Sequence, residues 1–219
     1  MKYHASPQSD VAPFVTSRIL SQLQQGKRVL WLLSGGSGGA VCVAVSKLLK
    51  GHDLSNLIVT MSDERYGDIN HPDENVAQLM ADGLSLDGAT FYRPLIGQSR
   101  DDTTTAFSAW LDEQNLAVDY RIAVLGIGED GHTCGIKPQS DAVTATTSAA
   151  SFVGNDFERI TITPAFLRRV DEAVVQAYGN NKHSVVERLL NGEGDRAEYP
   201  MLTIQDIPTV TIFSDYKEK

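Results

Sequence analysis

Short apolar runs alternate with helical segments along almost the whole chain, and this alternation limits the fold more than any other feature. Apolar β-rich runs that end in glycine or polar loops predict strands at 27–33, 57–61, 89–92, 120–125, 159–163, 173–178 and 209–213. Apolar spacing of three and four residues predicts helices at 7–25, 40–50, 73–82, 101–115 and 181–190, with another that begins at Pro164. The alternation predicts an α/β fold whose twisted, mostly parallel sheet is covered by helices on both faces.

Length and composition predict that residues 1–219 form a single domain. The chain has 219 residues, of which 42% are hydrophobic, enough for one substantial core. Residues 139–156 are rich in Ala, Thr, Ser and Asp and lack periodicity. We interpret them as a loop, or as an element that the sequence predicts poorly, rather than as a linker between domains.

The charge balance and the cysteine count narrow the set of partners. A net charge of -9 provides no general attraction for nucleic acid or an anionic membrane, so any anionic ligand must meet locally placed cations. The first residues lack the pattern of a signal peptide, and the apolar runs are too short to cross a bilayer. Cys42 and Cys134 suit neither a disulfide framework nor a zinc site. We therefore expect a cytoplasmic protein with no metal, as a monomer or a small homo-oligomer.

A glycine-rich loop, Ser34-Gly35-Gly36-Ser37-Gly38-Gly39, joins the first predicted strand to a predicted helix. Glycines let backbone N–H groups turn towards an anion while the helix directs its positive end at the same place, which indicates a phosphate cradle. The letters also match G-x-S-x-G with Ser37 as a serine-hydrolase nucleophile, although little chain precedes the loop to build the supporting sheet. An ordinary flexible turn is the third interpretation.

Two further loops follow predicted strands and carry charged side chains. Asp63 and Arg65 come directly after the strand at 57–61, where they are either a surface ion pair or part of a ligand crevice. If that strand lies beside the one that precedes the glycine loop, both residues face that loop.

The third loop, in the stretch 121–138, places Asp130 two residues before His132 on a glycine turn. An adjacent acid can fix the tautomer of a histidine and raise its basicity, so His132 is a candidate general base. The alternative is a histidine that only hydrogen-bonds ligand or backbone. The turn also matches G-x-G-x-x-G, but no clear helix follows it and no acidic residue ends a second strand, which argues against a dinucleotide site.

Taken together, SGGS, SDER and GIGEDGHT resemble the 6-phosphogluconolactonase family, to which glucosamine-6-phosphate deaminases are closely related. The resemblance extends through ERITITP at 158–164 and GNNK at 179–182, and it covers about 27–190. It implies a Rossmann-like fold of the phosphosugar isomerase type. It also implies an enzyme that hydrolyses 6-phospho-glucono-1,5-lactone to 6-phosphogluconate, in the oxidative pentose phosphate pathway, without metal or coenzyme.

The resemblance also implies a role for each matching residue. His132 would be the base and Asp130 its orienting partner, while Arg65 and Asp63 would position the substrate, with Arg65 near the developing oxyanion. The phosphate would bind to the backbone of Gly35, Gly36 and Ser37 and to two cations, Arg159 and Lys182.

One position distinguishes the lactonases from the deaminases that this sequence resembles. Deaminases of this kind place a glutamate five residues after the histidine, and lactonases usually an apolar residue, whereas this chain has Lys137. The missing carboxylate and the form of the SDER motif favour the lactonase. The glycine loop lacks the Thr-Pro that usually follows its serine, and the Pro-rich run before residue 158 is absent. A divergent or non-catalytic phosphosugar-binding protein and a deaminase-like enzyme therefore remain as alternatives.

Overall fold

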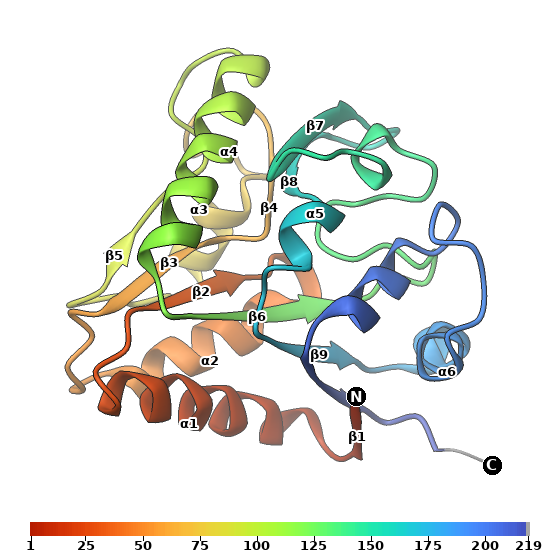
Figure 1. Cartoon of the computed structure of the whole chain (residues 1–219), viewed down its shortest axis with the longest axis horizontal. Coiled ribbons are helices and arrows are strands. Elements are labelled where there is room, and N and C mark those ends of the chain that lie inside the picture. The colour runs from red at the N-terminus through yellow and green to blue at the C-terminus, as the bar shows by residue number, and fades with distance from the viewer. Residues whose placement is uncertain (218–219) are drawn as a thin grey trace.

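A seven-stranded parallel sheet forms the centre of the computed structural model, which describes residues 1–217 (Figure 1). Its strand order is β1-β10-β9-β6-β2-β3-β5, and every neighbouring pair runs parallel. The strands are β1 (Lys2–Ala5), β2 (Val29–Leu33), β3 (Leu57–Met61), β5 (Thr90–Phe91), β6 (Tyr120–Gly126), β9 (Glu172–Ala177) and β10 (Thr209–Ser214). The α/β fold class that the alternation predicts is therefore confirmed.

Helices cover both faces of this sheet. They are α1 (Val11–Gln24), α2 (Gly39–Leu49), α3 (Asn75–Ala81), α4 (Arg100–Ala117), α5 (Pro164–Leu167) and α6 (His183–Asn191). In Figure 1, α1 and α2 lie below the sheet, and α4 and α5 lie above it. Buried side chains of α1, α2 and α3 belong to one apolar cluster, and those of α4, α5 and α6 to another.

The two clusters exist because successive residues of a strand point to opposite faces. On β2, Leu30 and Leu32 pack into the cluster on the α4 side, while Trp31 and Leu33 pack into the cluster on the α1 side. All five residues of β2 are buried. A strand buried on both faces reads as a continuous apolar run, which explains why the central strands are easily predicted.

A second, three-stranded antiparallel sheet stands above the carboxyl ends of the central strands (Figure 1). It consists of β4 (Asp63–Arg65), β8 (Glu158–Ile162) and β7 (Ala149–Val153), with β8 in the middle. The chain leaves β3, passes one residue and enters β4. This sheet forms one wall of the pocket that is described below.

The predicted elements agree with the structure to within a few residues, but three strands lie where none was expected. β1 is an edge strand with three exposed residues out of four, and β4 has only three residues. β7 lies in the segment that we interpreted as a loop or a poorly predicted element, and for 149–153 the loop interpretation is wrong. Short or half-exposed strands carry little apolar periodicity. They form because they pair with distant parts of the chain, which a local pattern does not reveal. Within 1–217, no helix is both long and apolar enough to cross a membrane.

Candidate active site

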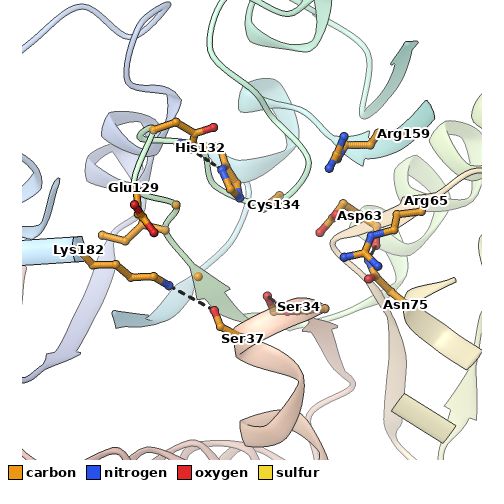
Figure 2. Close-up of a pocket in the computed structure, with 16 residues that line it drawn as sticks. Ser34, Ser37, Asp63, Arg65, Asn75, Glu129, His132, Cys134, Arg159 and Lys182 are labelled. Atoms are coloured by element: carbon orange, nitrogen blue, oxygen red, sulfur yellow. Dashed lines mark hydrogen bonds and ion pairs between the residues drawn. The ribbon is translucent and has the colours of Figure 1, made fainter. Parts of the chain in front are cut away.

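A pocket of about 450 Å³ opens at the carboxyl ends of the central strands, between the two sheets (Figure 2). This edge of an open parallel sheet is where ligands usually bind, and the volume suits a small sugar phosphate. The pocket is lined by Ser34, Gly35, Gly36, Ser37, Asp63, Arg65, Asn75, Gly126, Ile127, Gly128, Glu129, Asp130, His132, Cys134, Arg159 and Lys182. Every residue that the sequence placed at the site is in this set.

The glycine loop runs from the end of β2 into the first turn of α2. β2 pairs with β3 in parallel, so the loop lies beside the segment that carries Asp63 and Arg65, as the sequence predicted. Gly36 has a φ of +52°, a backbone conformation that favours glycine. A Cβ on Gly35 would lie 2.3 Å from Oδ1 of Asn75, so only glycine fits against that side chain. Gly35, Gly36 and Ser37 of this loop line the pocket, directly before the start of α2.

Strand alternation in β4 explains why the acid and the base of the SDER motif face the pocket together. Asp63 and Arg65 are two residues apart and lie on one face, while Glu64 between them points the other way. The carboxylate of Glu64 is fully buried and accepts hydrogen bonds from the backbone N–H groups of Arg65, Asn75 and Val76. Glu64 thus fixes β4 to the first turn of α3, and burial raises the pKa of its carboxyl to about 8 although these backbone hydrogen bonds oppose the shift.

The two pocket-facing residues of β4 are held by their neighbours. The hydroxyl of Ser62 donates to Oδ1 of Asp63 at 3.1 Å. Burial raises the pKa of the Asp63 carboxyl above its usual range, although the Ser62 hydrogen bond and the nearby charges of His132 and Arg159 oppose this. The guanidinium of Arg65 donates to the carbonyl of Asp73 at 3.1 Å and lies 4.6 Å from the ring centre of Phe157.

His132 and Asp130 form a direct pair on the loop that follows β6. Nδ1 of His132 lies 2.5 Å from Oδ1 of Asp130, and the backbone N–H of His132 donates to the same oxygen at 3.2 Å. Burial by itself would raise the pKa of Asp130, but the His132 hydrogen bond and the charge of Lys137 lower it below its usual range. A Cβ on Gly128 would lie 2.1 Å from Nδ1 of His132, so the imidazole occupies space that only glycine leaves open.

Lys182 lies beside the glycine loop. Its Nζ is 3.3 Å from Oγ of Ser37, an interaction drawn in Figure 2. Burial lowers the pKa of the Lys182 ammonium, and the charge of Glu129 partly opposes that effect. Glu129 itself accepts a hydrogen bond from the side chain of Asn181. A cation at the start of α2 makes this end of the pocket suitable for an anion.

Arg159 lies on the other side of the pocket from Lys182, close to Asp63 (Figure 2). It is directly opposite Arg65 in the ladder between β4 and β8. Both of its terminal nitrogens bond to the carboxylate of Asp156, one of them at 2.8 Å. That carboxylate raises the pKa of Arg159 and keeps it charged.

The sequence missed several residues of the pocket wall. Asn75 donates from Nδ2 to the carbonyl of Asp63 at 3.0 Å, and Glu129 and Cys134 also line the cavity. The Cys134 thiol is unpaired, and burial raises its pKa, so it is not activated as a nucleophile. In the described part of the chain, no group of three or more His, Cys, Asp or Glu side chains has an arrangement that could hold a metal ion.

An open parallel sheet, a glycine loop at a helix start and a charged pocket at the strand ends define a Rossmann-like α/β protein with a charged crevice. Residues 5–212 match the family model described as glucosamine-6-phosphate isomerases/6-phosphogluconolactonase. The chain belongs to this family.

Curated relatives and solved structures agree with this assignment. The 6-phosphogluconolactonase of Xylella fastidiosa strain 9a5c is 27% identical over 209 residues, which are 89% of this chain and 84% of that protein. A crystal structure of a 6-phosphogluconolactonase from Shewanella baltica has a TM-score of 0.80 at 24% identity and covers 97% of this chain and 96% of that one. A monomeric glucosamine-6-phosphate deaminase has a TM-score of 0.77 at 16% identity, with 98% and 97% coverage. Both branches of the family therefore share this fold.

Proposed function

We propose that the protein hydrolyses 6-phospho-glucono-1,5-lactone to 6-phosphogluconate and acts in the oxidative pentose phosphate pathway. The observation that carries the proposal is one cavity lined by the His132–Asp130 pair, by Arg65 and by Lys182. Relatives such as the Xylella protein are named 6-phosphogluconolactonase, which supports the same reaction. Lactone hydrolysis needs a base for water, positive charge near the carbonyl oxygen and a site for the phosphate.

His132 is the base in this proposal. Asp130 accepts a hydrogen bond from Nδ1–H, which leaves the lone pair of Nε2 free to take a proton from water. The water oxygen attacks the lactone carbonyl, and the tetrahedral intermediate collapses when the bond from this carbon to the ring oxygen breaks. The imidazolium then returns its proton to the departing ring oxygen, so the base is regenerated in each cycle.

Arg65 and Asp63 act on the reacting end of the substrate. The Arg65 guanidinium is fixed by the Asp73 carbonyl and the Phe157 ring, so its charge is preorganised near the developing oxyanion. Asp63 accepts hydrogen bonds from sugar hydroxyl groups on the same side of the pocket.

The phosphate binds at the opposite end. Lys182, the hydroxyl of Ser37 and the free N–H groups of the loop at Gly35 and Gly36 converge there. Arg159 was expected to share the phosphate with Lys182, but the two cations stand on different sides of the pocket. We assign Arg159 to the sugar side, where it supplements Arg65.

The Ser37 environment does not favour a serine hydrolase. The positive φ of the turn is at Gly36 rather than at Ser37. The Ser37 hydroxyl is contacted by the amide of Gln176 at 3.4 Å and by Lys182, and His132 is not among its hydrogen-bond partners within residues 1–217. The hydroxyl is therefore better placed to bind a phosphate oxygen than to attack a carbonyl.

The wild-type protein tests the proposal directly. We expect purified protein to accelerate the loss of freshly prepared 6-phosphogluconolactone well above the no-enzyme rate, with 6-phosphogluconate as the product. Binding of 6-phosphogluconate without turnover would instead indicate a phosphosugar-binding protein. Release of ammonia from glucosamine 6-phosphate would indicate a deaminase.

Lys182→Met is expected to raise KM for the phosphorylated lactone by about 10- to 100-fold with little change in kcat. The reason is the loss of one charge-assisted hydrogen bond to the phosphate. Steady-state kinetics with Lys47→Met, an exposed lysine on α2, provide the control. With unphosphorylated gluconolactone the Lys182 variant and the wild type should be equal. A penalty of the same size on both lactones would contradict the phosphate assignment.

We also propose that the protein works in the cytoplasm on a small phosphosugar, as a monomer or a small homo-oligomer. Two free thiols, Cys42 and Cys134, are compatible with a reducing compartment. The local cations of the pocket provide the attraction for an anion that the net charge of -9 cannot provide.

A further inference from the structure

Lys137 contacts the His132–Asp130 pair from outside the pocket. Its Nζ lies 3.2 Å from Oδ2 of Asp130 and 3.2 Å from Nδ1 of His132. The Lys137 side chain is only 26% exposed, and it is not part of the pocket lining. The side-chain contacts of Lys137 are therefore with the pair.

The backbone around Lys137 directs the side chain back to the pair. The carbonyl of Lys137 accepts hydrogen bonds from the N–H of Ser140 at 3.1 Å and from its hydroxyl at 2.7 Å. Ile136, the preceding residue, is fully buried, and its N–H donates to the carbonyl of Thr133. These backbone contacts hold Lys137 in place, so that its side chain reaches the His132–Asp130 pair.

One arrangement of donors gives each oxygen of the Asp130 carboxylate a partner, with Nδ1 of His132 protonated. An ammonium is only a donor, so Lys137 donates to Oδ2 of Asp130. The second carboxylate oxygen, Oδ1, is then left to accept from Nδ1–H of His132. Each oxygen of Asp130 has its own donor, and the carboxylate cannot turn without losing one of them.

We propose that Lys137 is a positioning residue for the general base: it holds the Asp130 carboxylate against Nδ1 of His132 and places a positive charge beside the imidazole. This inference rests on the proposed function, because it assumes that His132 Nε2 takes the proton from water. It also gives a role to the lysine at this position, where deaminases carry a glutamate and lactonases usually carry an apolar residue.

The direction of the effect follows from charge. Negative groups favour the protonated imidazole, and a positive group 3.2 Å from Nδ1 opposes it. The charged groups around His132 are Asp130, Glu129 and Lys137 on its own loop, Asp63 and Arg65 from β4, Arg159 from β8 and Lys182 across the pocket. Lys137 is the cation in direct contact with the ring. Its removal makes protonation easier, so the base is lost at a higher pH.

A charge series at this position tests the proposal. The acidic limb of the kcat/KM profile is expected to move up by about one pH unit in Lys137→Met. It should move further in Lys137→Glu and stay near the wild-type position in Lys137→Arg. At high pH, kcat of Lys137→Met is expected to be about 3- to 10-fold low with KM unchanged, as for one lost hydrogen bond. Lys50→Met, on an exposed residue outside the site, is the matched control.

An NMR titration separates this proposal from the lactonase proposal, because it needs no activity. The ring nitrogen signals of His132, assigned by comparison with His132→Gln, should show the Nδ1–H tautomer in the wild type. Their titration should move to higher pH in Lys137→Met. If those signals titrate identically in the two proteins, the proposal is overturned even where the lactone is hydrolysed. If they differ but no lactone is turned over, Lys137 still acts on the His132–Asp130 pair, but the proposed function fails and the pair serves another reaction.

Discussion

His132→Gln is expected to hydrolyse 6-phosphogluconolactone about 10²- to 10⁴-fold more slowly than the wild type, the usual contribution of a positioned general base. Glutamine fills much of the same space but cannot accept a proton from water at neutral pH. The measurement is kcat/KM after subtraction of spontaneous opening. Binding of 6-phosphogluconate should change little, because the phosphate end of the pocket is intact.

His52→Gln is the matched control, since His52 is exposed and lies outside the pocket. It should keep wild-type kinetics. A His132→Gln protein that turns over the lactone at the wild-type rate would show that the water is activated elsewhere and would overturn the mechanism.

Gly128→Ala is expected to be nearly as damaging, although it adds only a methyl group. The new Cβ would lie 2.1 Å from Nδ1 of His132 and 2.5 Å from Oδ1 of Asp130, so both side chains must leave their positions. A misplaced base loses most of its effect, and we expect kcat/KM to fall by about 10²-fold or more. The two side chains are partly exposed, so they can move towards solvent and the thermal midpoint should change little.

A double-mutant cycle shows whether this loss acts through the histidine. If Gly128→Ala only displaces His132, the double variant with His132→Gln should be no slower than His132→Gln alone. Additive losses, or a large fall in the thermal midpoint of Gly128→Ala, would indicate that the methyl group disturbs the loop more widely.

The main strands and helices could be predicted because their burial leaves a periodic pattern of apolar residues in the sequence. β3 spans Leu57–Met61, as the apolar run indicates, and α4 has the buried Phe107 and Leu111 of its expected stripe. β4 could not be predicted from the sequence. Its three polar residues, Asp63–Arg65, form a strand only because they pair with β8, almost a hundred residues further along the chain. That strand is also what turns Glu64 away from the pocket, a distinction that the motif cannot reveal.

The members of the candidate site were accessible from the sequence, but their arrangement was not. The motifs correctly brought His132, Arg65 and Lys182 to one cavity, because loops after parallel strands open at one edge. The separation of Arg159 from Lys182 could not be foreseen, since it depends on how the small sheet stands over the large one. Asn75 was missed because its role comes from contact with Gly35, and a distant contact leaves no local signal.

The sequence by itself determined the α/β architecture and the chemistry available at the strand ends, because strand and helix periodicity and glycine turns are local properties of the chain. Only the tertiary structure decided which polar side chains meet: Lys137 with Asp130 and His132, Lys182 with Ser37, and Arg159 with Asp156. The physical reason is that electrostatic and hydrogen-bond interactions depend on distances of a few ångströms between side chains. The packing of the two sheets sets those distances across the pocket, and loop conformation sets them within each loop.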